Sequence, residues 1–195
     1  GGRLLVEAGT GVGKSFAYLL PAIERARATG ERVVVATNTI ALQEQLLGKD
    51  VPLIRRALGL SEDDLKIVLV KGRGNYVSIR RLALASKKQE RLFPDEASRR
   101  TLHTVEDWAY ETQDGTLATL PQLERPAVWD RVQSDSGNCM GRKCPTYKQC
   151  FYQRARREME RGQVLITNHA LFFSDLALRS REVGFLPKYD HVILD

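Results

Sequence analysis

A glycine-rich run near the start of the chain has the spacing of a phosphate-binding loop. It consists of Ala8, Gly9, Thr10, Gly11, Val12, Gly13, Lys14 and Ser15, with Ala8 where a glycine is usual. The glycines allow several backbone N–H groups to point inward at phosphate oxygens. A helix starting near Lys14 would add the positive end of its dipole. Lys14 would place a positive charge near the β- and γ-phosphates, and Ser15 would supply a hydroxyl that binds Mg²⁺. The run predicts a site for ATP and Mg²⁺, and the alternative is a glycine-rich turn with a surface lysine.

Asp195 is a second candidate for the same site, because it follows the apolar run His191–Leu194. That run predicts a strand, and an aspartate at the end of such a strand holds Mg²⁺ in phosphate-loop enzymes, usually through water. We therefore expect catalytic roles for Lys14 and Asp195. The alternative for Asp195 is an ordinary strand-end aspartate.

A third polar segment follows another apolar run, Arg32–Thr37. Thr37 and Thr39 form a Thr-x-Thr sequence ahead of a short amphipathic helix that carries Gln43. Hydroxyls and amides at a strand-to-helix turn are suited to gripping a phosphodiester backbone without reading its sequence. We predict DNA contacts at these positions, and the alternative for Thr39 is a simple helix cap.

The apolar runs predict the elements that must position these residues. We expect strands, mostly continuous in Val, Ile and Leu, at Arg3–Glu7, Arg32–Thr37, Lys66–Val70, Gln163–Thr167 and His191–Leu194. Helical spacing follows the loop at Lys14–Ala28, where Pro21 should loosen the helix and Gly30 should end it, and recurs at Ile40–Leu47. Alternating strands and helices indicate an α/β fold with a parallel sheet.

The stretch 71–161 interrupts this alternation, because it is rich in charged residues and has few β-branched runs. We predict a mainly helical, cysteine-containing insertion at 71–161, between two parts of one ATP-binding domain at 1–70 and 162–195. The chain begins and ends directly at expected strands, so we expect it to be part of a longer protein.

Composition excludes a membrane-spanning or secreted class and favours a polyanionic partner. The net charge is +6, and no apolar run approaches the length of a bilayer span. No signal peptide opens the chain, so the cytoplasm is the expected compartment. The chain has three cysteines, Cys139, Cys144 and Cys150, and an odd, clustered set favours a metal or cluster site over disulfides.

Several of these segments, in this order, resemble one family. Glu7–Ser15 is similar to motif I of superfamily 2 helicases, Thr37–Leu46 to their motif Ia, and the final Val-Ile-Leu-Asp to the start of a DEAH box. The segment 71–76, the cysteine spacing and Thr167–Leu171 resemble the DinG branch of the XPD-like iron–sulfur DNA helicases. The resemblance implies a RecA-like motor domain, a [4Fe–4S] insertion and 5′-to-3′ unwinding of DNA.

The chain departs from that family at the first of four expected cysteine ligands, where it has Ser78. Three thiolates are a poor fit to a Cys₄ cluster. The open alternatives are a labile or three-iron cluster, zinc with His103 or His169 as the nearest further ligand, or cysteines packed as small hydrophobes without metal.

Arginines surround the cysteines and include Arg154 and Arg157. On a helix whose apolar face is Phe151, Ala155 and Met159, they would face solvent. We predict that Arg154 and Arg157 contact single-stranded DNA, and the alternative is an ordinary solvated charged face.

The sequence thus predicts the motor domain of a monomeric ATP-dependent DNA helicase acting on single strands and duplex junctions. Taken alone, these residues should bind but not turn over ATP. Alternatives from other classes are a non-catalytic DNA-binding or redox-sensing phosphate-loop module, and an ATP-dependent nuclease on the same motor.

Overall fold

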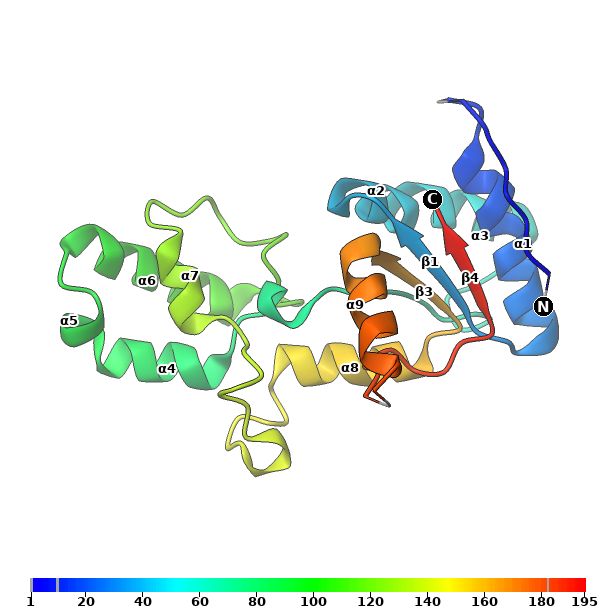
Figure 1. Cartoon of the computed structure of the whole chain (residues 1–195). Coiled ribbons are helices and arrows are strands. Elements are labelled where there is room, and N and C mark those ends of the chain that lie inside the picture. Colours follow the sequence, from blue (N-terminus) through cyan, green and yellow to red (C-terminus); the bar gives the residue numbers. More distant parts are fainter. Residues whose placement is uncertain (1, 10, 182) are drawn as a thin grey trace. The chain divides into compact units, whose positions relative to one another are not determined.

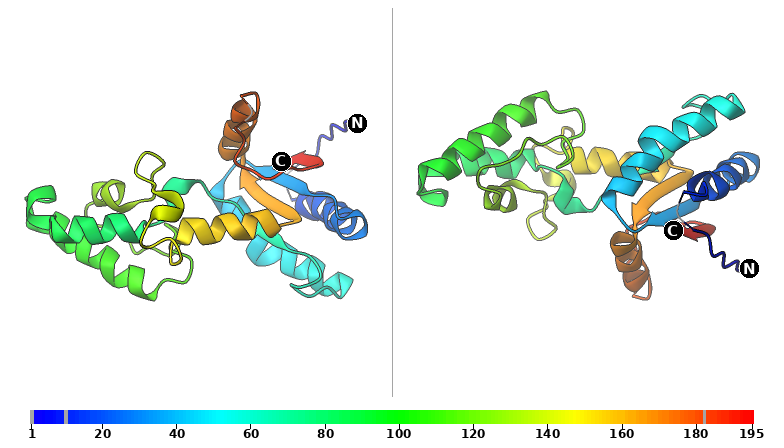
Figure 2. Two further views of the ribbon diagram at one scale, coloured as in Figure 1. Left: turned by 90° about the horizontal axis from the view of Figure 1, so that it is seen from below. Right: turned by 90° about the horizontal axis from the view of Figure 1, so that it is seen from above.

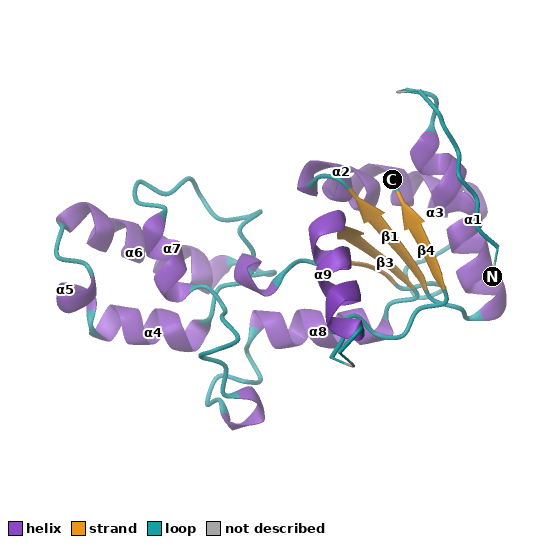
Figure 3. Ribbon diagram, in the orientation of Figure 1, coloured by secondary structure: helices purple, strands orange, loops and turns teal. Residues whose placement is uncertain are grey.

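The computed structural model describes residues 2–9, 11–181 and 183–195, and it divides the chain into two compact units (Figure 1). One unit, here the sheet unit, comprises Gly1–Val70 and Glu158–Asp195. The other, the helical unit, is Lys71–Arg157. Figure 3 shows that the strands lie in the sheet unit, whereas the helical unit is built from helices and loops.

The sheet unit contains a four-stranded sheet in the order β2-β3-β1-β4. The strands are β1 (Val33–Thr37), β2 (Ile67–Leu69), β3 (Val164–Asn168) and β4 (His191–Leu194), and all neighbours pair in parallel. Four of the predicted strands and the α/β class are therefore confirmed. Parallel neighbours need crossover connections, and the helices between the strands supply them.

The predicted strand at Arg3–Glu7 is wrong. These residues form no strand, and Leu4, Leu5 and Val6 are 89%, 99% and 70% exposed. An apolar run becomes a strand only when a neighbour satisfies its backbone N–H and C=O groups. No described strand pairs with residues 3–7, and β4 pairs with β1 along one edge only.

Helices cover both faces of the sheet (Figure 2). On one face, α1 (Lys14–Thr29), the π-helical turn η1 (Leu46–Asp50) and α3 (Val51–Leu58) bury Val33, Val35, Val164 and Ile166. The short helix α2 (Ile40–Gln45) follows β1 and leads into η1. On the other, α9 (His169–Arg179) contributes Phe172 to a cluster with Val34, Ala36 and Leu165. Successive strand residues thus enter opposite cores, as expected of a sheet covered on both sides.

The first helix agrees with its sequence signals. α1 starts at Lys14, continues through Pro21 and ends at Thr29 with Gly30 as its C-cap. Its buried residues, Leu19, Ala22, Ile23 and Ala26, recur at helical spacing. This packing fixes the direction of the first turn, which carries Lys14 and Ser15.

The helical unit has its own core, formed by α4 (Ile79–Lys87), α5 (Gln89–Leu92), α6 (Glu96–Glu111), α7 (Ala127–Val132) and the start of α8 (Phe151–Arg161). Trp108 and Trp129 meet edge to face in this core, with ring centroids 6.1 Å apart. Short 3₁₀ turns, η2 (Arg73–Asn75) and η3 (Gly141–Lys143), interrupt the loops. The expected apolar face of α8 is confirmed, because Phe151 and Met159 are buried and Ala155 is partly buried.

No helix in residues 2–9, 11–181 and 183–195 combines the length and the apolar character needed to cross a lipid bilayer.

Candidate nucleotide site and cysteine pocket

The phosphate-loop residues lead into α1 as a loop with two left-handed glycines. Gly11 has φ 78° and Gly13 has φ 82°, a region that L side chains rarely adopt. Gly13 is the N-cap of α1, so no side chain caps this helix end, and the first turn holds no acidic residue. The N–H groups and the positive end of α1 therefore have no compensating anion from the helix itself, which suits phosphate binding. Thr10 lies outside the described residues.

Lys14 curls back toward the loop. Its Nζ lies 3.5 Å from the carbonyl oxygen of Ala8, at the beginning of the glycine-rich run. The ammonium group is thus held on the loop side of α1, where phosphates would lie. The sequence-predicted binding residues Gly9 and Val12 are exposed along the same loop.

The side chains of Ser15 and Asp195 meet at a third residue, Tyr18. The Tyr18 hydroxyl donates a hydrogen bond to Asp195 Oδ2 at 3.0 Å, and the Ser15 side chain interacts with the same hydroxyl. Burial and the nearby Asp195 carboxylate raise the pKa of Tyr18 well above its usual value, so its hydroxyl keeps its proton. The fold therefore brings together the two residues expected to hold Mg²⁺, although 180 positions separate them in the sequence.

Sequence reasoning missed Tyr18. Its signal was its position in α1, three residues after Ser15, which places both side chains on one helix face. The partner after β4 became visible only in the fold.

The strand ends also position Asp195. Its backbone N–H donates to the carbonyl oxygen of Ala36 at 2.9 Å, and Nε2 of His169 lies 3.0 Å from the same oxygen. The carboxyl ends of β1, β3 and β4 thus meet at one edge of the sheet, where ligands bind in open α/β folds.

The Thr-x-Thr segment runs from a buried strand end to the surface. Thr37 is fully buried, and its hydroxyl donates to the Thr39 carbonyl at 3.3 Å. Thr39 is exposed and caps α2 by accepting from the Leu42 N–H at 3.2 Å, so the simple capping role is present. Gln43 is 1% exposed, and its Nε2 has no hydrogen-bond partner among the described residues. Of the three DNA contacts predicted in this segment, Thr39 is therefore the one at the surface.

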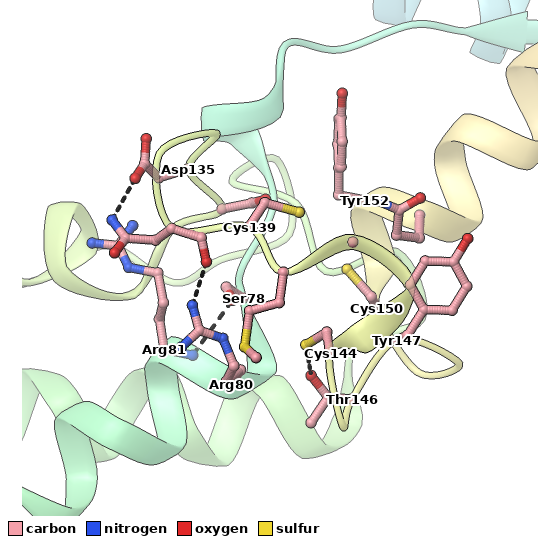
Figure 4. Close-up of a pocket in the computed structure, with 15 residues that line it drawn as sticks. Ser78, Arg80, Arg81, Asp135, Cys139, Cys144, Thr146, Tyr147, Cys150 and Tyr152 are labelled. Atoms are coloured by element: carbon pink, nitrogen blue, oxygen red, sulfur yellow. Dashed lines mark hydrogen bonds between the residues drawn. The ribbon is translucent and has the colours of Figure 1, made fainter.

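In the helical unit, one pocket gathers the residues of the expected metal site (Figure 4). Its lining includes Ser78, Cys139, Cys144 and Cys150, from the start of α4, the loop after α7 and the residue before α8. Backbone N–H of Gly141 and the Arg73 guanidinium lower the pKa of the Cys139 thiol. All three cysteines are free thiols.

The pocket does not fit a four-thiolate cluster. Ser78 supplies the fourth position, and its oxygen caps α4 by accepting from the Arg81 N–H at 3.4 Å. Cys144 Sγ lies 3.3 Å from the Thr146 hydroxyl. Across the described residues, no three His, Cys, Asp or Glu side chains stand close enough together to hold a metal ion. No histidine lines the pocket, and His103 instead contacts Glu106 at 2.9 Å.

Two arginines of α4 bind backbone oxygens of the cysteine loop and of the end of α7. Arg80 donates to the Asn138 carbonyl, and Arg81 donates to the carbonyls of Gln133 and Asp130, the latter at 2.9 Å. These guanidinium groups are engaged by backbone oxygens. They stabilise the pocket wall without metal.

The predicted DNA contacts on α8 are exposed. Arg157 is exposed, and so is Arg154, which lies over the Phe151 ring at 5.1 Å and donates to the Gln113 carbonyl. Both arginines are accessible to a phosphate backbone.

An α/β fold with a glycine-rich loop, a lysine and a strand-end aspartate is the arrangement that phosphate-loop nucleotide-binding proteins use. The DEAD/DEAH box helicase family model matches residues 1–69. The chain is 36% identical over 200 residues to the ATP-dependent DNA helicase YoaA of Escherichia coli, covering 100% of the chain and 30% of that protein. It is 32% identical over 194 residues to YoaA of Haemophilus influenzae, covering 98% of the chain and 29% of that protein.

A second group of relatives carries the name DinG. The chain is 34% identical over 208 residues to the ATP-dependent DNA helicase DinG of Escherichia coli, covering 100% of the chain and 28% of that protein. The chain is thus similar to DEAD/DEAH box helicases over residues 1–69 and to YoaA and DinG over nearly its whole length, as the sequence motifs indicated. It spans less than a third of the length of these relatives.

Proposed function

We propose that this chain is the nucleotide-binding part of the first motor domain of an ATP-dependent DNA helicase. The observation that carries the proposal is the meeting of Ser15 and Asp195 at the Tyr18 hydroxyl, beside the uncapped start of α1. A glycine loop alone would support only phosphate binding. A hydroxyl and a carboxylate that converge at the loop add the ligands that Mg²⁺ prefers.

The residues fit ATP and Mg²⁺ as follows. The glycine loop and the first turn of α1 would bind the phosphates, and Lys14 would neutralise charge on the β- and γ-phosphates. Ser15 and Asp195 would orient Mg²⁺, Asp195 through water. When bound, the ion offsets negative charge that develops on the phosphates. The RecA-like ATP-binding region would comprise residues 1–70 and 162–195.

The DNA partner is proposed from the relatives, which are named DNA helicases. Exposed Thr39 at the end of β1, together with Arg154 and Arg157 on α8, would contact the phosphate backbone of a single strand. Movement along that strand, unwinding of duplex junctions with 5′-to-3′ polarity, and action as a monomer are part of this proposal.

The region 71–161 would correspond to the iron–sulfur insertion of the family. In this chain the three thiols line one pocket but do not stand within metal-binding reach of one another among the described residues, and Ser78 is engaged as a cap. We therefore propose that iron binds weakly here, and only when the cysteine loop closes around it.

Isothermal titration calorimetry with Mg²⁺–ATP tests the nucleotide site. Lys14→Ala should weaken binding at least about 10-fold, because it removes a charged phosphate contact. Lys49→Ala is the matched control, since Lys49 is exposed on η1, and it should bind like the wild type. Equal affinity of the wild type and Lys14→Ala would contradict the proposal.

A further inference from the structure

We propose that Tyr18 is a positioning residue of the nucleotide site. Its hydroxyl fixes the orientation of the Asp195 carboxylate and ties that carboxylate to Ser15 before Mg²⁺ arrives. This inference rests on the proposed function, and it assigns a role to a residue that the phosphate-loop motif does not contain.

The Tyr18 hydroxyl interacts with both expected Mg²⁺ ligands. It donates to Asp195 Oδ2 at 3.0 Å, and the Ser15 side chain also interacts with it. No second side chain within residues 2–9, 11–181 and 183–195 donates to this carboxylate. Tyr18 therefore decides which way the carboxylate faces, and Asp195 Oδ1 is left for the ion or its bound water.

The packing of Tyr18 makes its hydroxyl a fixed point. The side chain is partly buried against the core beneath α1, which includes Leu46, Val51 and Ile54 from η1 and α3. A packed ring has few rotamers, so the oxygen at its end has a defined position. The carboxylate of Asp195, in contrast, stands at the end of an edge strand whose Leu194 is 56% exposed.

The Tyr18 hydrogen bond goes to Asp195 although a second, buried carboxylate lies near enough for its charge to act on the phenol. The charge of Asp50 also acts on Tyr18, and Asp50 is only 3% exposed. Asp50 Oδ2 has no hydrogen-bond partner among the described residues, although an unsatisfied buried acceptor is costly. A phenol has one proton to donate, and here it goes to Asp195.

Outer partners of this kind raise metal affinity because they hold a ligand in its binding orientation before the metal binds. The expected consequence is specific. Removing the hydroxyl should weaken the Mg²⁺-dependent part of nucleotide binding and leave the Mg²⁺-free contacts of the loop unchanged.

The test uses the whole 195-residue chain and a fluorescent ATP analogue, titrated with Mg²⁺ and, separately, in EDTA. Tyr18→Phe keeps the packed ring and removes only the oxygen, so the fold should persist, which urea unfolding checks. We expect Tyr18→Phe to raise the Mg²⁺ concentration at half-saturation about 3- to 10-fold, with unchanged affinity in EDTA. Tyr189→Phe, a tyrosine that packs against the other face of the sheet, is the matched control and should behave like the wild type.

A double-mutant cycle shows whether Tyr18 acts through Asp195. In the Asp195→Asn background, Tyr18→Phe should cause no further change in the Mg²⁺ midpoint. Additive effects of the two substitutions, or an equal loss of affinity in EDTA and in Mg²⁺, would overturn the positioning role.

The same measurements separate this inference from the proposed function. An unchanged Mg²⁺ midpoint in Tyr18→Phe, together with weakened binding in Lys14→Ala, overturns the inference alone. Unchanged binding in Lys14→Ala overturns the proposed function, and the inference with it.

Discussion

Substitutions of Ser78 can distinguish two roles for this residue, helix capping and metal binding. In the structure its oxygen accepts from the Arg81 N–H at the start of α4. A serine N-cap stabilises a protein by about 0.5–2 kcal/mol relative to alanine. Because the observed distance of 3.4 Å is long for such a bond, we expect the lower part of that range, about 0.5–1 kcal/mol.

Two substitutions should therefore destabilise the metal-free protein equally. Ser78→Ala and Ser78→Cys both remove a good cap, and each should lower the free energy of unfolding in urea by about 0.5–1 kcal/mol. Ser78→Thr keeps a capping hydroxyl and is the matched control. An unchanged stability in Ser78→Ala would mean that the capping bond contributes nothing.

The two variants should be equally stable without metal but should differ in how much iron they bind. Thiolates bind iron more strongly than a serine hydroxyl, which is hard and weakly acidic. After anaerobic reconstitution, Ser78→Cys should hold about four irons per chain and release them more slowly in air than the wild type. Ser78→Ala should match the wild type, because Ser78 is engaged as a cap and not as a ligand.

Iron content and the absorbance of the sulfur-to-iron charge-transfer band give the result directly. If the wild type holds four irons as firmly as Ser78→Cys, another group supplies the fourth bond and our reasoning fails. If Ser78→Ala releases iron that the wild type keeps, Ser78 is itself a ligand. If no variant holds iron, the thiols do not form a cluster site.

Three further predictions concern DNA binding, the core and the loop. Affinity for single-stranded DNA should fall as the salt concentration rises, and the slope of log affinity against log salt measures how many phosphates the protein neutralises. Replacing Arg154 and Arg157 with Ala should reduce that slope by about 0.7 for each phosphate that is no longer neutralised. An unchanged slope would mean that both side chains face solvent only. Asp175 is fully buried and accepts from Arg179 at 2.5 Å and from two backbone N–H groups at 2.7 and 2.8 Å. Asp175→Asn should therefore cost about 2–3 kcal/mol of unfolding free energy in urea, and a wild-type value would refute that assignment. Gly13→Ala should weaken nucleotide binding in calorimetry, because at φ 82° a side chain is strained by about 1–2 kcal/mol, and wild-type affinity would show that the loop relaxes without cost.

The sequence by itself determined the local elements. Continuous apolar runs indicated β1, β2, β3 and β4. Burial on both faces explains the runs of the central strands β1 and β3, which need no polar alternation, whereas the edge strand β4 alternates between partly buried and exposed residues. Helical spacing, with Gly30 after the last turn, indicated α1. The phosphate-loop residues could be recognised because their chemistry depends on neighbours along the chain, which the sequence shows directly.

The sequence could not determine which elements become neighbours. Arg3–Glu7 has the composition of a strand, yet it stays exposed because no described strand pairs with it. Gln43 is a polar residue of the kind expected at a surface contact, yet packing buries it. Both outcomes depend on which strands and helices surround a segment, and the composition of the segment does not reveal them.

Only the tertiary structure decided how the candidate sites are assembled. Parallel pairing of β1 with β4 brings Asp195 to the start of α1, where Tyr18 joins it to Ser15. Folding of the helical unit brings Ser78 into one pocket with the three cysteines, but as the cap of α4. Hydrogen bonds are short-range and directional, so a side chain's partner is fixed only when the packed elements have placed a donor and an acceptor within about 3 Å.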